Sequence, residues 1–220
     1  MSVLHTLREA CLGQLPSRSH PHALRLPARL SPPAGHGDFA IRPIREDDQE
    51  EWNEVRWRNR QWLSPWDSGD PMQGPGMTYS QWMASQERDR QDGASAVFLM
   101  EFQSAIVGQI SLGAICYGSM RTATVGYWVD RDHIGHDFAP LALTLLSEWA
   151  LKDPNGPRLH RIEVAIIPDN QRSLRVAEKV GMKAEGLRRR YMYVNGDWRD
   201  HLTFSLLAEE FDPAAVYPRL

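Results

Sequence analysis

Cysteine is scarce in this 220-residue sequence, and long apolar runs are missing from it. The two cysteines, Cys11 and Cys116, are too few for a disulfide framework or a cysteine-based metal site, so we expect reduced thiols and no bound metal. No apolar stretch reaches the roughly 18 residues that a membrane span needs, and charged residues interrupt the N-terminal segment where a secretory signal would have its apolar core. We therefore expect a cytoplasmic protein with no membrane partner.

An excess of charge of one sign is also missing. The formal net charge is -3 and the sequence pI is about 6.2, which argues against direct nucleic-acid binding by the whole surface. Hydrophobic residues make up 42% of the chain, enough for one sizeable core. We predict a single domain over residues 38–212, a partly ordered arm at 1–37 and a tail at 213–220. Within the arm, Val3–Leu15 favours a short helix and His22–Leu30 an additional edge strand.

Apolar periodicity predicts an α+β fold. Period-two patterns and continuous apolar runs predict strands at 39–44, 96–101, 106–112, 121–130, 159–167, 192–194 and 198–207. Offsets of three and four predict helices at 47–61, 78–91 and 138–151, and a last helix that ends at Gly181. Two local signals support these boundaries, a capping box of Thr78 with Gln81 and a hairpin turn at Asn195-Gly196.

The chain is organised around the segment from 121 to 151. A buried strand leads into a loop at Gly135-His136-Asp137, and an amphipathic helix follows the loop. The first turn of a helix has N–H groups without internal partners and carries the positive end of the dipole, so this loop can hold a phosphate. The aromatic-bearing loop at 64–77 is a second candidate binding element, although its aromatic residues could equally pack a helix pair.

Three motifs resemble one branch of a known family. They are Pro168-x-Asn170-x-x-Ser173 leading to Gly181, the ending Trp198-Arg199-Asp200-His201, and the segment Arg58–Trp66. Together they are similar to the RimJ/RimL type of GNAT N-acetyltransferase. The resemblance extends from Ile41 to Leu207, about three quarters of the chain.

The loop after the long strand matches the acyl-CoA signature of that family only in part. The signature reads Arg/Gln-x-x-Gly-x-Gly/Ala; Gly135 and Ala139 fit it, whereas Ile134 and Asp137 depart from it. The Asp137 carboxylate would occupy the helix N–H groups that a pyrophosphate needs and would repel the phosphates. Either Gly135 alone shapes the loop, or the cofactor binds weakly.

The resemblance implies a GNAT fold and an acyl-transfer activity. The fold would have a central mixed sheet of six to seven strands, splayed between its fourth and fifth strands and flanked by about four helices. Acetyl-CoA would bind in the cleft as co-substrate. The acetyl group would pass directly, through a tetrahedral intermediate, to the α-amino group of a protein or peptide, a ribosomal protein among the candidates.

The resemblance also implies roles for single residues. Ser173 would serve the leaving thiolate, and Asn170 would bond the pantetheine or the attacking amine, or only cap its helix. The implied cofactor-binding residues are Trp128, Val129, Ile134, Gly135, His136, Asp137, Phe138, Ala139, Asn170 and Ser173. The implied acceptor-binding residues are Arg60, Trp62, Trp66, Tyr127 and Tyr193.

Several alternatives stay open. No general base is assigned, because Thr124 and Met192 stand at the positions where relatives have Glu. The remaining carboxylates near the expected cleft, Glu163, Glu185 and Asp200, are interpreted as structural. A water chain could suffice, since an N-terminal amine has a pKa of roughly 8. Two other functions are compatible with the fold: transfer to a small-molecule amine, and a binding module that has lost its cofactor. The oligomeric state is open between monomer and homodimer.

Overall fold

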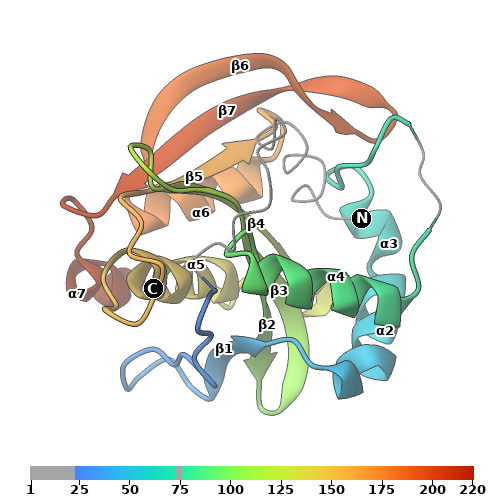
Figure 1. Ribbon diagram of the computed structural model, residues 1–220, viewed down its shortest axis with the longest axis horizontal. Coiled ribbons are helices and arrows are strands. Elements are labelled where there is room, and N and C mark those ends of the chain that lie inside the picture. The colour runs from blue at the N-terminus through green and yellow to red at the C-terminus, as the bar shows by residue number, and fades with distance from the viewer. Residues whose placement is uncertain (1–22, 73–75) are drawn as a thin grey trace.

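The computed structural model describes residues 23–72 and 76–220 (Figure 1). Seven strands form one mixed sheet in the order β1-β2-β3-β4-β5-β7-β6. The strands are β1 (Phe39–Pro43), β2 (Ala96–Phe102), β3 (Ala105–Cys116), β4 (Thr122–Val129), β5 (Arg161–Ile166), β6 (Lys183–Val194) and β7 (Asp197–Leu207). The helices are α2 (Gln49–Arg58), α3 (Arg60–Leu63), α4 (Tyr79–Gln91), α5 (Phe138–Leu151), α6 (Gln171–Val180) and α7 (Pro213–Val216). The predicted α+β class and mixed sheet are confirmed.

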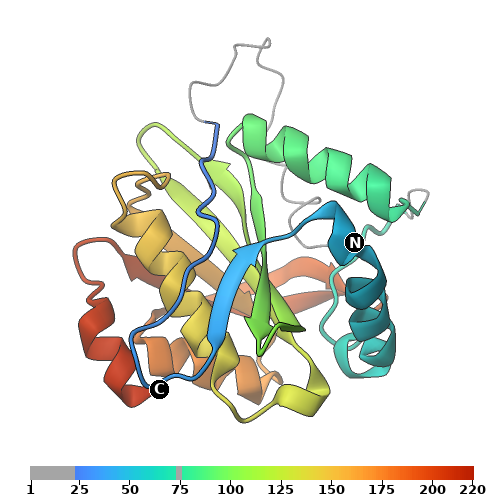
Figure 2. The ribbon, with the colours of Figure 1, turned by 90° about the horizontal axis from the view of Figure 1, so that it is seen from below.

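Helices cover both faces of the sheet. Figure 2 shows α5 and α7 on one side and α2 and α4 on the other. Helix α5 is buried along nearly its whole length, with Leu143 and Leu146 at 0% exposure, because it packs against the sheet, α6 and α7. The apolar stripe predicted at 138–151 is therefore the centre of the main core. The prediction of about four helices accounts for the four longer ones and misses the short α3 and α7.

The local cap and turn signals are confirmed. The N–H of Gln81 donates to Thr78 Oγ1 at 3.2 Å and the N–H of Thr78 to Gln81 Oε1 at 2.9 Å, which closes the predicted capping box of α4. Asn195 and Gly196 have φ angles of 48° and 88°, the left-handed conformation that a two-residue hairpin turn requires. Short-range hydrogen bonding thus decides these boundaries.

The single helix predicted at 47–61 is wrong. A 3-10 turn at Glu46–Asp48 precedes α2. The helix is then interrupted at Asn59, which separates α2 from α3. The Asn59 side chain, in a residue only 1% exposed, donates to Val55 O at 2.9 Å and to Asp130 Oδ1 at 2.7 Å, and accepts from the N–H of Arg131 at 2.9 Å. The bonds to Asp130 and Arg131 are long-range and accompany the interruption of the helix, and no local pattern in the sequence encodes them.

Strand β6 is much longer than the predicted 192–194. Its first half is polar and exposed, so it lacks the apolar alternation that identifies a strand. Pairing with β7 holds it in place, with register shifts between Ala184 and Gly186 and between Arg188 and Met192. In Figure 1 the two strands arch together over one end of the molecule.

The chain ends pack against the domain where they are described. Leu24 is buried and its N–H donates to Arg90 O at 2.9 Å, while Leu30 makes an isolated bridge to Ile41; no continuous strand forms over the described part of 22–30. The helix predicted at Val3–Leu15 lies outside the described residues. In the tail, the Tyr217 hydroxyl donates to Glu148 Oε2 at 3.0 Å. Over residues 23–72 and 76–220, no helix has the length and apolar character to cross a bilayer.

The sheet opens between β4 and β5. These strands pair in parallel over three positions, Thr122 with Arg161, Ala123 with Ile162 and Thr124 with Glu163, and then separate. Strand β4 continues to Val129 paired only with β3. The predicted splay between the fourth and fifth strands is confirmed, and it leaves one edge of β4 without a strand partner.

Candidate active site

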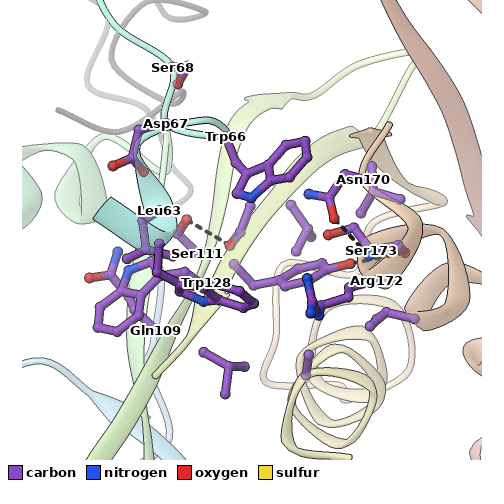
Figure 3. Close-up of a pocket in the computed structure, with 18 of the residues that line it drawn as sticks. Leu63, Trp66, Asp67, Ser68, Gln109, Ser111, Trp128, Asn170, Arg172 and Ser173 are labelled. Atoms are coloured by element: carbon purple, nitrogen blue, oxygen red, sulfur yellow. Dashed lines mark hydrogen bonds between the residues drawn. The ribbon is translucent and has the colours of Figure 1, made fainter. Parts of the chain in front are cut away.

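A cavity of about 970 Å³ occupies the gap where β4 and β5 part (Figure 3). One side, which we call the α6 side, is formed by the free edge of β4, the loop before α5 and helix α6. The other, the α2 side, is formed by α2, α3, α4 and the segment 64–72, which the isolated bridge from Ser68 to Val194 ties to β6. Both sides line one continuous space.

The free edge of β4 offers backbone groups to this space. The N–H of Asp130 donates to Val107 O in β3 at 2.8 Å, and alternate residues of a strand direct their backbone groups to opposite edges. Val125, Tyr127 and Val129 therefore present N–H and C=O groups to the gap. Trp128 has the opposite register: its backbone faces β3, and its ring lies on the α2 side beneath the Arg56 guanidinium at 5.3 Å.

The first turn of α5 has free donors. The first internal bond runs from the N–H of Leu141 to Asp137 O at 3.0 Å, and Pro140 has no N–H. The N–H groups of Phe138 and Ala139 therefore have no partner within the described chain. Gly135, at φ 87°, gives the loop the left-handed turn that brings the chain round to this helix end.

Asp137 does not block the helix end in the way the sequence suggested. Its carboxylate makes no cap hydrogen bond and instead pairs with Lys179 Nζ of α6. Its backbone adopts φ 55°, a left-handed conformation that aspartate tolerates better than most residues. The predicted occupation of the N–H groups by this side chain is wrong, because a tertiary ion pair holds the carboxylate.

The start of α6 brings the two predicted catalytic residues together. Asn170 Oδ1 accepts from the N–H of Ser173 at 3.1 Å, so Asn170 caps the helix and keeps its amide NH₂ available. The Ser173 hydroxyl makes no hydrogen bond to any residue in the described part of the chain, and both residues line the cavity. The Tyr127 hydroxyl donates to Ser173 O at 3.5 Å, and burial raises the pKa of Tyr127. Figure 3 shows Asn170 and Ser173 side by side on α6.

Three cations on α6 were missed by the sequence reasoning. Arg172, Arg175 and Lys179 all line the α6 side, at offsets of three and seven along the helix. That spacing places the three side chains on one face of the helix, so the sequence alone could have predicted a cationic face on α6. The Arg172 guanidinium also lies 4.5 Å from the centre of the Trp62 ring, across the opening to the α2 side.

The predicted acceptor residues separate into two groups. Trp62, Trp66 and Tyr127 line the cavity, Tyr127 on its α6 side. Arg60 and Tyr193 do not: the Arg60 guanidinium stacks on Trp57 at 4.2 Å, and Tyr193 packs edge-on against Trp198. Among the predicted cofactor residues, His136 lies outside the lining and stacks on Phe138. The α2 side is completed by an aromatic cluster of Trp52, Tyr79 and Trp82.

Two donors on the α2 side have no acceptor among residues 23–72 and 76–220. Arg56 Nη1 and Ser68 Oγ are buried, line the cavity and have no hydrogen-bond partner in the described chain. The second Arg56 nitrogen, Nη2, is held by Asp67 Oδ2 at 2.7 Å, so the guanidinium has a fixed position. Buried donors without acceptors are costly, and a ligand with oxygen atoms would satisfy them.

The carboxylates considered as bases are all engaged elsewhere. Glu163 accepts from Arg161 Nε at 2.7 Å and from Arg188 Nη2 at 3.1 Å. Glu185 accepts from Arg161 and from Ser205 Oγ, and Asp200 accepts from the N–H of Arg190 at 2.8 Å. None of the three lines the cavity. Their role in this structure is to hold β5, β6 and β7 together.

The family model described as an acetyltransferase (GNAT) domain matches residues 38–183. This chain belongs to the GNAT acetyltransferase family. The GNAT match covers β1 to the start of β6, and with it both strands of the gap and both helix ends described above.

Other GNAT proteins resemble the chain over different lengths. The solved structure of Mycobacterium smegmatis RimJ in complex with CoA-disulfide is 29% identical, covers 91% of this chain and 98% of its own, and has a TM-score of 0.76. The Escherichia coli [ribosomal protein uS5]-alanine N-acetyltransferase is 25% identical over 76% of this chain and 87% of its own. The Bacillus subtilis protein named "Probable N-acetyltransferase YjcK" is 36% identical over 46% of this chain, and that match spans about half, 55%, of the Bacillus protein. The resemblance to RimJ/RimL-type enzymes is thereby confirmed.

Proposed function

We propose that this GNAT protein transfers the acetyl group of acetyl-CoA to the α-amino group of a protein or peptide. The observation that carries the proposal is the unpaired edge of β4, which leads from free helix N–H groups to a wide aromatic space. The relative named [ribosomal protein uS5]-alanine N-acetyltransferase and the structure of RimJ in complex with CoA-disulfide support the same assignment.

The residues present fit acetyl-CoA. The backbone groups of Val125, Tyr127 and Val129 would pair with the pantetheine amides as a neighbouring strand would. The N–H groups of Phe138 and Ala139 would bind the pyrophosphate at the positive end of α5. The cations of α6 would add charge to the same region.

The chemistry needs a proton for the leaving thiolate and stabilisation of the carbonyl oxygen. Ser173 has an uncommitted hydroxyl on the α6 side and would donate the proton. The N–H of Val129 would donate to the thioester oxygen as it becomes negative in a tetrahedral intermediate. Asn170, which already fixes the N–H of Ser173, would use its free NH₂ to bond the pantetheine or the amine.

The orphaned donors favour a peptide acceptor over a simple amine. Arg56 Nη1 and Ser68 Oγ both need acceptor oxygens, which the carbonyl groups that follow a peptide N-terminus supply. An alkylamine has no such oxygen and would leave both donors unsatisfied.

A titration and an acceptor panel test this function. We expect acetyl-CoA to bind with micromolar affinity in calorimetry and CoA release to require an added acceptor. Peptides with a free N-terminal alanine or serine should give a kcat/KM at least about tenfold above alkylamines of matched amine pKa, because one hydrogen bond to a charged donor supplies about 1.5–3 kcal/mol. A preference for alkylamines would assign the small-molecule reaction instead. Absence of acetyl-CoA binding would leave only a binding module.

The ion pair between Asp137 and Lys179 makes a further prediction. Asp137→Gly should lower the Kd for CoA about threefold, because it removes a carboxylate beside the phosphates from a partly exposed pair. Lys179→Gln should raise the Kd about tenfold, since it removes a cation and leaves Asp137 unpaired. Calorimetric titration of each variant checks both values. The matched control is Lys183→Gln, whose ammonium pairs with Glu210 outside the cavity and should leave the Kd unchanged.

A further inference from the structure

His201 is a titratable side chain on the cavity wall that the proposed function does not yet use. It lies on β7, is only 3% exposed and lines the cavity. The register pairs Thr203 with Ala165, and alternation along β7 puts His201 on the same face of the sheet as Thr203. That face is the one that Ala165 and Met192 present to the cavity, so the imidazole belongs to the space that an acceptor would enter.

The tautomer of His201 follows from its one hydrogen bond. Nδ1 lies 2.9 Å from Arg199 O, and a carbonyl oxygen can only accept, so Nδ1 carries the hydrogen. In the neutral ring Nε2 is then an unprotonated nitrogen with a free lone pair. Nε2 has no hydrogen-bond partner in the described part of the chain.

The two carboxylates and the other imidazole of the cavity wall each have a partner. Asp67 is paired with Arg56, and Asp137 with Lys179. His133 Nδ1 is bonded to Asp130 Oδ2 at 3.0 Å at the start of the loop before α5. His133 Nε2 has no partner in the described chain either, but His133 lies before α5, beside the helix end where the pyrophosphate would bind. His201 is the imidazole on the part of the wall formed by β5, β6 and β7, next to Ala165 and Met192.

The surroundings of His201 keep the ring neutral at ordinary pH. Burial lowers its pKa below the ordinary 6.5, the nearby positive charge of Arg199 lowers it too, and the Arg199 carbonyl and the Asp200 carboxylate act in the opposite direction. On β6, Arg188 is its register partner and Tyr191 stacks edge-on at 5.8 Å. An unprotonated imidazole at neutral pH is the form that can accept a proton.

We propose that His201 accepts the proton of the attacking α-ammonium group, an inference that rests on the acetyl transfer proposed above. The ammonium gives one proton to Nε2, and the free amine forms the N–C bond to the acetyl carbon. The C–S bond then breaks, and the leaving thiolate receives a proton from Ser173, which is reprotonated by the second proton of the amine. His201 returns its proton to solvent.

His201→Asn is the most informative variant. The Asn amide NH₂ occupies the place of Nδ1–H and can still donate to Arg199 O, so the structural bond is kept and the basic nitrogen is lost. We expect kcat/KM for a peptide acceptor to fall about a hundredfold at pH 7. The loss should shrink as the pH rises and as the pKa of the acceptor amine falls, because less deprotonation is then needed. The Kd for acetyl-CoA should not change.

Two further measurements keep the test decisive. His160→Asn, which removes an exposed imidazole paired with Glu209 away from the cavity, should behave as wild type. Imidazole in the buffer should restore part of the activity of His201→Ala, which covers the case in which the Asn variant does not fold. A loss that is constant across pH and acceptors, or a wild-type rate in His201→Asn, overturns the assignment of the base. Wild-type protein that binds acetyl-CoA but acetylates no peptide overturns the proposed function instead.

Discussion

Ser173→Ala is expected to lower kcat about a hundredfold and to change the KM for acetyl-CoA less than twofold. The proposed general acid is lost, so the thiolate leaves without a proton, and general acid catalysis is worth about 10²-fold to 10⁴-fold. The cap of α6 survives because Asn170 accepts from the backbone N–H of residue 173, which alanine retains. Steady-state release of CoA with a saturating peptide acceptor measures the effect.

Ser80→Ala is the matched control for this variant. Ser80 also lies in the first turn of a helix, α4, but it is exposed and outside the cavity, so its removal should leave kcat unchanged. Melting temperatures of both variants within about 2 °C of wild type would establish that folding is intact. A Ser173→Ala enzyme with more than a third of wild-type kcat would show that another group, or water, protonates the thiolate.

Asp130→Ala is expected to destabilise the fold by about 3 kcal/mol, because it breaks a network of three donors around a buried carboxylate and leaves the buried Asn59 amide without that acceptor. Asp130 is 0% exposed and accepts from Arg58, from Asn59 Nδ2 at 2.7 Å and from His133 Nδ1 at 3.0 Å. This network joins the break between α2 and α3 to the end of β4. The melting temperature should fall by about 10 °C, as expected for a domain of roughly 200 residues. Urea unfolding and calorimetry check the two values.

The stability that Asp130 contributes to the folded state depends on pH in a defined direction. Burial alone would raise the pKa of Asp130. The hydrogen bonds from Arg58, Asn59 and His133 outweigh burial and lower this pKa to about 2, from an ordinary 3.8. The carboxylate therefore stabilises the folded state fully above about pH 4, and the contribution is lost as the pH falls toward 2. The difference between wild type and Asp130→Ala should narrow over that interval.

The control for the network is Asp132→Asn. It removes the same charge two residues further on, from an exposed side chain, and should change the free energy of unfolding by less than about 0.5 kcal/mol. An equal effect of the two variants, or a difference from wild type that stays constant between pH 5 and pH 2, would mean that net charge and not the buried network is responsible.

Local and periodic features of the sequence determined most of the architecture. The apolar stripe of 138–151, the capping box at Thr78 and the hairpin turn at Asn195-Gly196 each act over a few residues, so a pattern in the chain is sufficient to predict them. Asn170 and Ser173 likewise lie close together in sequence, at the cap and in the first turn of α6, and both line the cavity.

Only the tertiary structure decided how the site is arranged. The break at Asn59, the pairing of Asp137 with Lys179 and the position of His201 on the cavity wall all depend on residues far apart in the chain. No single segment contains both partners of such a contact, and its energy arises only when the sheet has brought them within hydrogen-bonding distance. The sequence therefore determined most of the elements and placed Asn170 and Ser173 at the start of one helix. Packing decided which charges are paired and which ring nitrogen of His201 is left without a hydrogen-bond partner in the described chain.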